Sequence, residues 1–130
     1  MHRIFVYGTL KRGHGNNALM RISEYHGPAM TVPRYRMLEP SFPVVLDDPN
    51  GLQVAGEVYH VNDWTLAELD RLEGVASGMY TRNVIEIVQL GGRRRLLLSA
   101  YIYVGGERWA LSRCPAYTRV NAAGALDWQR

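Results

Sequence analysis

A glycine-punctuated segment near the N-terminus is the part of the sequence best suited to hold a polar ligand. The apolar residues Ile4 to Val6 predict a short strand, and the sequence Tyr-Gly-Thr-Leu-Lys-Arg-Gly follows it over residues 7–13. Because Gly8 has no Cβ atom, its main chain can adopt a conformation closed to other residues and bring N–H groups close to an anion or a carbonyl oxygen. The segment therefore predicts a ligand site made of backbone amides.

The same loop does not fit a phosphate-binding loop of nucleotide-dependent proteins. Gly8 and Gly13 have the spacing of the two glycines in G-x-x-x-x-G-K-[ST], but His14 and Gly15 stand where the lysine and the hydroxyl residue would be. The dinucleotide motif G-x-G-x-x-G does not occur in the chain. The sequence therefore argues against nucleotide binding.

Glu73 is the carboxylate whose local setting best suits acid–base chemistry. The spacing of Leu66, Leu69 and Leu72 predicts a helix, and Gly74 stands where a glycine would end it. Glu73 then falls at the negative end of the helix dipole, which disfavours a carboxylate and raises its pKa. A raised pKa suits a group that takes and gives a proton near neutral pH. From this pattern alone, an exposed glutamate beside a terminating glycine is the alternative interpretation.

Two further acidic residues are candidates for the same site. Glu57 lies in the expected strand Gln53 to Val61, and the alternation of strand side chains places it on one face with Tyr59. A structural ion pair, for instance with Arg82, is the alternative role for Glu57. Asp70 shares a helix face with Glu73, so it either lies near the site or serves as a neighbour of the helix end.

The tyrosines of the last long strand are candidates for the wall of a pocket. Tyr101 and Tyr103 occupy one face of that strand, where they could join Tyr7 and Tyr59. Tyrosines packed in the core are the alternative interpretation.

Metal and nucleophile chemistry have little support in the sequence. The histidines His2, His14, His26 and His60 are scattered, with no H-x-x-x-H spacing and no cysteine partner, so no metal site is expected. The single cysteine, Cys114, is expected to be a structural thiol. No serine stands in the context of a nucleophile elbow.

Length and composition indicate one compact domain spanning residues 1–130. The chain has 130 residues, of which 47% are hydrophobic and 21% are charged. No apolar run is as long as a membrane span, and the N-terminus does not resemble a signal peptide. A lone cysteine agrees with a reducing compartment, so we expect a cytoplasmic protein with no membrane partner.

The net charge of +3 does not by itself indicate a nucleic-acid partner. Only Arg93 to Arg95 cluster, directly after Gly91 and Gly92 at an expected hairpin tip. There is no basic tail and no aromatic stacking motif. We interpret the arginines as a solvated turn and expect no nucleic-acid binding.

The expected elements are mostly strands joined by tight turns. Besides the first strand, a short helix is expected over Asn17 to Ser23, and the clearest helix begins at Asn62, or at Thr65 in a capping box with Glu68. The expected strands are His26 to Thr31, Arg34 to Leu38, Val44 to Leu46, Gln53 to Val61, Arg82 to Leu90 and Arg93 to Val104. We expect the third and fourth of these to be joined through a Pro-Asn-Gly turn and the last two to form a long hairpin. This pattern predicts an α+β domain with mostly antiparallel pairing; residues 107–130 carry no clear prediction.

Four segments in order along the chain resemble the gamma-glutamylcyclotransferase-like superfamily, in particular its gamma-glutamylamine cyclotransferase and AIG2-like branch. The first is the Tyr-Gly-Thr-Leu-Lys-Arg-Gly sequence described above. The others are Leu38-Glu39-Pro40 with Phe42-Pro43, then Gly56-Glu57-Val58-Tyr59, then Leu69-Asp70-Arg71-Leu72-Glu73-Gly74 followed by Tyr80-Thr81-Arg82. The resemblance implies a curved, barrel-like mixed sheet with short helices packed against it and a cavity at one mouth.

The resemblance also implies an activity that needs no cofactor. Enzymes of this kind release 5-oxoproline and a free amine from a small γ-glutamyl amide, because the α-amine of the substrate attacks its own γ-carbonyl. It implies that Glu73 is the general acid and base, that the backbone of Gly8, Thr9 and Leu10 binds substrate oxygens, and that Tyr7 lines the pocket. A domain of the same fold that binds a small molecule without turnover is the alternative. The leaving amine and the oligomeric state stay open.

Overall fold

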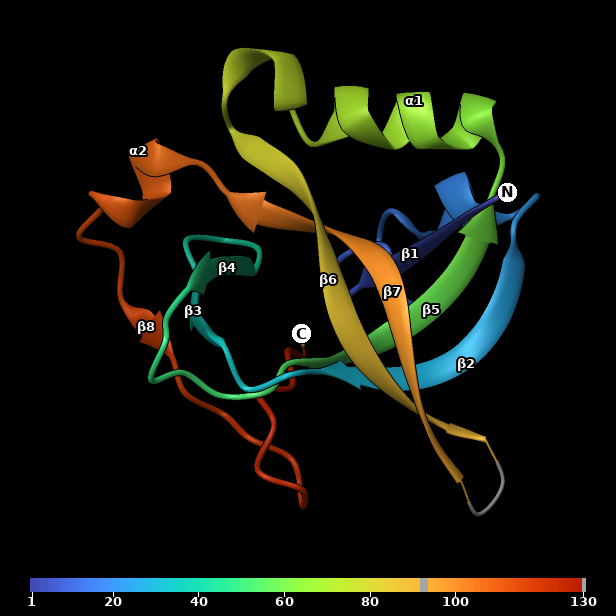
Figure 1. The fold of residues 1–130 in the computed structure, drawn as a ribbon. Helices are drawn as coiled ribbons and strands as arrows, with labels where there is room; N and C mark the ends of the chain where they lie inside the picture. Colours follow the sequence, from blue (N-terminus) through green and yellow to red (C-terminus); the bar gives the residue numbers. More distant parts are fainter. Residues whose placement is uncertain (92–93, 130) are drawn as a thin grey trace.

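The structure is a computed structural model that describes residues 1–91 and 94–129. Figure 1 shows a curved sheet of long strands with one helix lying along its outside. In chain order the elements are β1 (His2–Val6), η1 (Asn17–Met20), β2 (Glu24–Thr31), β3 (Tyr35–Leu38), β4 (Val44–Asp47), β5 (Ala55–Val61), α1 (Asp63–Leu72), η2 (Val75–Ser77), β6 (Tyr80–Gly91), β7 (Arg94–Gly105), α2 (Glu107–Ala110) and β8 (Ala116–Tyr117).

Five strands form a closed barrel in the order β1-β5-β2-β6-β7. The barrel closes where β1 pairs in parallel with β7, with Ile4 opposite Tyr101, and the other neighbouring strands are antiparallel. The predicted α+β domain with a barrel-like, mostly antiparallel mixed sheet is confirmed.

A second, three-stranded sheet has the order β4-β3-β8. The expected turn does form, since the Gly51 amide donates to the Asp48 carbonyl oxygen over 2.8 Å. The strands on either side of the turn nevertheless belong to different sheets, because β4 pairs with β3 whereas β5 enters the barrel. The turn therefore connects a strand of one sheet to a strand of the other and does not form a hairpin.

Each barrel strand contributes at least one apolar side chain to the barrel interior. Phe5, Ala29, Val58, Ile87 and Ile102 belong to a single buried cluster. Because strand side chains alternate, the intervening residues face outward.

The outward face of β1 and β5 is covered by helix α1. Leu66 and Leu69 of the helix pack with Ile4, Val6 and Tyr59 in a second buried cluster. This packing fixes the end of α1 beside the end of β1.

Helix α1 begins and ends much as its sequence predicts. The Thr65 amide donates to Oδ1 of Asn62 over 2.8 Å, so Asn62 caps the helix and the alternative capping box at Thr65 does not form. Gly74 follows with φ of +66°, the left-handed conformation of a terminating glycine. No helix within the described ranges is long and apolar enough to cross a membrane. The helix expected over Asn17 to Ser23 is reduced to the single turn η1.

The long hairpin is confirmed, and it runs from Tyr80 opposite Gly105 to Gly91 opposite Arg94. Arg94 and Arg95 are exposed, as expected for a solvated turn, whereas Gly92 and Arg93 lie outside the described residues.

The C-terminal segment, for which the sequence gives no clear prediction, returns to the barrel. The Ala55 amide donates to the Leu126 carbonyl oxygen over 2.8 Å, and Trp128 is 3% exposed. Leu126 and Trp128 are therefore part of the folded core.

We predict that Gly56→Ala strongly destabilises the fold. A Cβ atom at this position in β5 would overlap the Val6 carbonyl oxygen and would lie 2.5 Å from the Phe5 ring. The backbone of β1 cannot give way without disturbing barrel closure, so the free energy of unfolding should fall by about 3 kcal/mol or more. Urea denaturation measures the change.

Gly13→Ala is the matched control for this substitution. Gly13 has φ of +81°, but no atom lies within 4 Å of the position that a Cβ atom would take, so only backbone strain of about 1 kcal/mol is expected. Equal losses in the two variants would show that contact with β1 is not the cause.

Candidate active site

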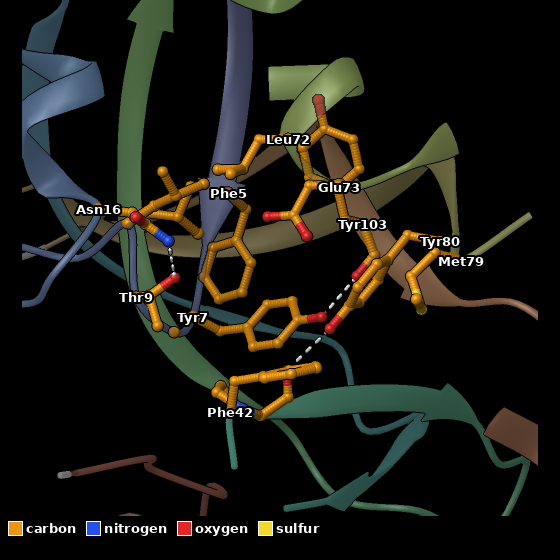
Figure 2. Close-up of a pocket in the computed structure, with 14 residues that line it drawn as sticks. Phe5, Tyr7, Thr9, Asn16, Phe42, Leu72, Glu73, Met79, Tyr80 and Tyr103 are labelled. Carbon is orange, nitrogen blue, oxygen red and sulfur yellow. Dashed lines mark hydrogen bonds between the residues drawn. The ribbon is translucent and has the colours of Figure 1, made fainter. Parts of the chain in front are cut away.

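A cavity of about 260 Å³ lies where the loop after β1 meets the end of α1 and the start of β6. Figure 2 shows the side chains that line it. The lining residues are Phe5, Val6, Tyr7, Gly8, Thr9, Leu10, Asn16, Phe42, Pro43, Leu72, Glu73, Met79, Tyr80 and Tyr103. The cavity is thus mainly apolar and aromatic, with a few polar groups, as small-molecule sites commonly are.

The cavity brings together residues that are far apart in the sequence. The loop residues Tyr7 to Leu10, the helix-end residue Glu73 and Tyr103 of β7 all contribute to its wall. Among the described residues that line it, Glu73 is the sole carboxylate, and none is a lysine or an arginine. Recognition of an anionic group in this cavity therefore depends on neutral donors.

Glu73 is held at the cavity by the end of α1. It is the C-cap residue, and its amide donates to the Leu69 carbonyl oxygen over 2.9 Å. Figure 2 shows its carboxylate directed into the cavity. Within the part of the chain that the structure describes, this carboxylate has no hydrogen-bond or ion-pair partner.

Burial raises the pKa of Glu73 to about 7. The rise has the expected direction, and its cause is loss of hydration in the cavity wall. At neutral pH the carboxyl group is therefore divided between its two protonation states, so it can both accept and donate a proton.

The loop after β1 presents backbone amides that its own fold leaves available. The amides of Gly8, Thr9 and Leu10 donate no hydrogen bond within the described residues, whereas the carbonyl oxygens of Gly8 and Thr9 accept from the Lys11 and Asn16 amides. The loop is thus closed through its carbonyl groups. This arrangement is the one expected for a backbone site that binds a negatively charged oxygen.

Two asparagines hold the loop in place. The side-chain amide of Asn16 donates to the Thr9 hydroxyl over 2.9 Å. That of Asn17 donates to the Leu10 carbonyl oxygen over 2.8 Å and to the Tyr59 hydroxyl over 3.0 Å. The loop is therefore tied to β5.

Gly8 is required for close packing and not for an unusual backbone conformation. It does not have a positive φ, so the conformation closed to other residues that a glycine permits is not used here. A Cβ atom on Gly8 would instead lie 2.5 Å from Cγ of Pro43. The glycine allows the loop to lie against Pro43 at the cavity wall.

Three tyrosines of the wall use their hydroxyl groups as structural donors. The Tyr7 hydroxyl donates to the Tyr103 carbonyl oxygen over 2.6 Å, and that of Tyr80 donates to the Pro43 carbonyl oxygen over 3.3 Å. Burial raises the pKa of Tyr7, Tyr80 and Tyr103 above the usual value for tyrosine. These hydroxyls therefore stay protonated, which leaves Glu73 as the group in the cavity that titrates near neutral pH.

Asp70 positions the side chain of Tyr103. The Tyr103 hydroxyl donates to Oδ1 of Asp70 over 2.7 Å, and Nε of Arg82 lies 3.3 Å from the same oxygen. Asp70 is thus a neighbour of the site that acts through Tyr103.

Tyr101 does not line the cavity, so its assignment to the pocket wall is wrong. It does share a face of β7 with Tyr103, but a step of two residues carries it about 6.6 Å along the strand. At that point its ring packs against the Arg82 guanidinium, 4.5 Å from the ring centre, and against His2.

Glu57, the other candidate carboxylate, lies outside the cavity lining. Its Oε1 accepts a hydrogen bond from the Arg12 amide over 2.8 Å. The ion pair with Arg82, which was one example of a structural role for Glu57, does not form, because Arg82 pairs with Asp70. Glu57 instead supports the far side of the loop after β1.

The histidines are not all scattered. His26 of β2 and His60 of β5 stack with ring centres 3.8 Å apart, and Glu24 lies beside them. The spacing along the chain showed no sign of this because the two strands become neighbours only in the barrel.

Several lining residues were not identified from the sequence as part of the site. They are the apolar and aromatic residues Phe5, Val6, Phe42, Pro43, Leu72, Met79 and Tyr80, together with Asn16. Phe42-Pro43 and Tyr80 lie in the segments that carry the family resemblance. Membership in those segments was therefore the signal that could have identified them as site residues. Cys114, expected to be structural, packs at the edge of the outer apolar cluster and not in the cavity.

The fold agrees with the outcome of comparison with known proteins. The family model described as gamma-glutamyl cyclotransferase, AIG2-like, matches residues 4–125. The chain therefore belongs to the AIG2-like gamma-glutamyl cyclotransferase family.

Individual relatives support this assignment. A gamma-glutamylaminecyclotransferase from Rattus norvegicus is 38% identical over 98 residues, which cover 67% of this chain and 64% of the rat protein. A relative from Arabidopsis thaliana is 36% identical over 93 residues, and the match spans 65% of this chain and 50% of the plant protein. The crystal structure of an AIG2-like protein from Mus musculus has a TM-score of 0.76 at 26% identity and covers 100% of this chain and 97% of its own.

We predict that Glu73→Gln stabilises the protein increasingly as pH rises. The folded-state pKa of about 7 lies above the ordinary value of 4.5, so the native state favours the protonated carboxyl group. This contribution to stability is complete below pH 4.5 and is lost as pH rises through 7. The variant should thus match wild type near pH 4.5 and exceed it by on the order of 1–3 kcal/mol at pH 8. Urea denaturation across this pH range measures the difference, and a difference independent of pH would contradict it.

Proposed function

We propose that this protein is a gamma-glutamyl cyclotransferase that converts a γ-glutamyl amide to 5-oxoproline and a free amine, with Glu73 as the general acid and base. The observation that carries the proposal is a carboxylate of raised pKa directed into a cavity that is also lined by Gly8, Thr9 and Leu10, whose amides make no hydrogen bond within the described residues. Family membership supports the same reaction class.

Glu73 has two tasks in the proposed reaction. The α-amine of the substrate is a nucleophile only when it is neutral, and a free α-amino group has a pKa near ~8. The ionised Glu73 carboxylate takes a proton from this amine as its nitrogen attacks the γ-carbonyl carbon. The carboxyl group then returns the proton to the departing nitrogen as the amide C–N bond breaks, so no water molecule is consumed.

The loop after β1 binds the negatively charged oxygens of the substrate. The amides of Gly8, Thr9 and Leu10 are suited to the α-carboxylate or to the oxygen that becomes negative when the ring closes. Because the lining residues include no lysine or arginine, these amides and the Asn16 side chain are the donors on which substrate orientation depends.

The apolar walls favour the curled substrate that ring closure requires. Phe5, Tyr7 and Tyr80 limit the space around the substrate chain, and the volume of about 260 Å³ suits a group of γ-glutamyl size. Holding an intramolecular nucleophile in a near-attack geometry can contribute up to about 7–11 kcal/mol to lowering the barrier.

A domain that binds a γ-glutamyl compound without turnover is the second candidate function. The cavity and its amides suit such a ligand equally well. The two candidates differ in whether Glu73 changes its protonation state during a cycle, so the product distinguishes them.

We predict that Glu73→Gln abolishes most 5-oxoproline formation while substrate binding persists. Glutamine has the size of glutamate but cannot exchange a proton, and general acid–base catalysis typically contributes ~10²- to 10⁴-fold. The assay follows 5-oxoproline by chromatography over a panel of γ-glutamyl amines and dipeptides, with calorimetry for binding. Glu57→Gln is the matched control and should retain turnover.

Two outcomes would contradict the catalytic assignment. If the Glu73 variant were as fast as wild type, Glu73 would not be the base. If wild type bound a γ-glutamyl compound but formed no product from any member of the panel, the protein would be a binding domain.

We also predict that kcat/KM rises with pH and shows an apparent pKa near 7. The base must be ionised to accept the proton, and kcat/KM reports the ionisation of the free enzyme. This rise of kcat/KM with pH should be seen in wild type and in Glu57→Gln with the same substrate. Any residual activity of Glu73→Gln should not rise with pH in this way. An unchanged rise of kcat/KM in that variant would assign the pKa to another group.

A further inference from the structure

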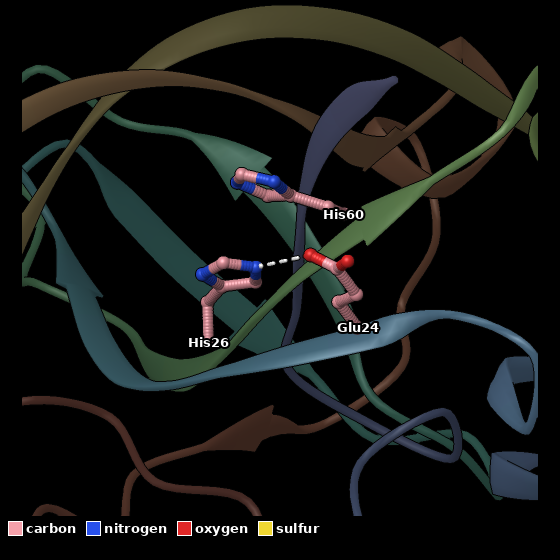
Figure 3. A group of neighbouring side chains, drawn as sticks. All are labelled: Glu24, His26 and His60. Atoms are coloured by element: carbon pink, nitrogen blue, oxygen red, sulfur yellow. Dashed lines mark hydrogen bonds and ion pairs between the residues drawn. The ribbon is translucent and has the colours of Figure 1, made fainter.

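We propose that Glu24, His26 and His60 form a binding site for a divalent transition-metal ion of the zinc and copper class, at the end of the barrel opposite the cavity. Each residue offers one ligand atom, and these atoms all lie within 4.8 Å of one another. Figure 3 shows the three side chains gathered between β2 and β5.

Strand pairing brings the three residues together. Glu24 of β2 is the direct cross-strand partner of His60 of β5. His26 follows Glu24 by two residues, so alternation places both side chains on one face of β2. A bound ion would therefore link two neighbouring strands of the barrel.

A bulge in β2 sets the position of His26. The register between β2 and β5 shifts between Tyr25 and Pro28, and Gly27 takes φ of +101°. A bulge leaves residues out of the regular ladder and turns their side chains. The His26 carbonyl oxygen accepts a hydrogen bond from the Gln89 side chain of β6, which anchors the bulged segment.

The three side chains are close together, but the stacked imidazole rings do not yet direct their nitrogen lone pairs at a common point, so both rings must turn for an ion to bind. Nε2 of His26 lies 3.1 Å from Oε2 of Glu24, and the two imidazole rings are inclined by 19°. Atoms bound to one tetrahedral zinc ion lie about 3.3 Å apart. Rotation of these side chains, of which Glu24 and His26 are exposed, can close the remaining distance without moving the strands.

The donor set selects the class of ion. Two imidazoles and one carboxylate suit zinc, copper and nickel, whereas magnesium and calcium require mostly oxygen ligands. The three protein ligands leave coordination positions for water. Copper should bind more tightly than zinc, as it does at most nitrogen and oxygen sites.

Arg3 is the cationic neighbour that opposes binding. It is the cross-strand partner of His60 from β1, and its Nη1 donates to the Ser99 carbonyl oxygen over 2.8 Å. That hydrogen bond holds the guanidinium toward β7. Arg3→Gln should therefore strengthen metal binding through removal of a nearby positive charge.

The site is separate from the proposed catalytic centre. On β1, alternation places Arg3 and Phe5 on one face, with Arg3 beside His60, whereas Tyr7 lies in the cavity wall just after the strand ends. Phe5 lies between them in the interior cluster. Metal binding can thus be measured whether or not the cavity turns over a substrate.

The test is titration of untagged protein with zinc and with copper by calorimetry and by competition with a metal-binding dye. We expect one ion per chain and a higher thermal unfolding temperature with metal, because the ion binds the folded state. His26→Gln and His60→Gln should each weaken binding at least ~10-fold, because even loss of a hydrogen-bond partner that only supports a metal ligand typically costs ~10- to 100-fold. Circular dichroism establishes that each variant is folded.

His2→Gln is the matched control. His2 lies on the opposite face of β1 from Arg3 and pairs with Asp63, so this variant should bind metal as wild type does. Absence of saturable binding by folded wild-type protein would overturn the proposal. Binding that survives both His26→Gln and His60→Gln, or that is lost in His2→Gln, would also overturn it.

Discussion

The parallel pairing of β1 with β7 is the constraint on which the rest of this structure depends. Without it the five strands would form an open sheet, and the residues after β1 would have no fixed relation to β7. With it, the chain leaves β1 at the barrel mouth, where the Tyr7 hydroxyl reaches the Tyr103 carbonyl oxygen. Helix α1 packs on the outward face of the same strand and so brings Glu73 to the same mouth. One strand thus positions both walls of the cavity.

The cavity places an ionisable carboxyl group where hydration is poor and no cation among the lining residues compensates. Such a group costs the folded state free energy whenever it is charged. Other parts of the fold offset this cost. They are the apolar interior, to which every barrel strand contributes, and a helix that is capped at its first turn and terminated by Gly74. A rigid frame around a poorly hydrated group is a common arrangement in sites where protons are exchanged.

The features that the sequence predicted are those that depend on neighbouring residues. The cap at Asn62, the terminating Gly74 and the loop after the first strand follow from local patterns, and so does the position of Glu73 at a helix end. Features that depend on how strands meet could not be predicted in this way. The stacking of His26 on His60 arises from barrel order, and the exclusion of Tyr101 from the cavity depends on where the pocket ends along β7. Burial of Trp128 depends on contacts with the opposite end of the chain.

The contact between Lys11 and Trp128 has a consequence for when the cavity can form. Lys11 is 6% exposed, and its ammonium group donates to the Trp128 carbonyl oxygen over 2.7 Å across a sequence separation of 117 residues. Contacts of such long range are slow to form because a large loop must close first. During synthesis on the ribosome, the loop after β1 therefore lacks the hydrogen bond from Lys11 to Trp128 until residue 128 has emerged. Residues 7–13 thus reach their final geometry only after the C-terminal segment has returned to the barrel.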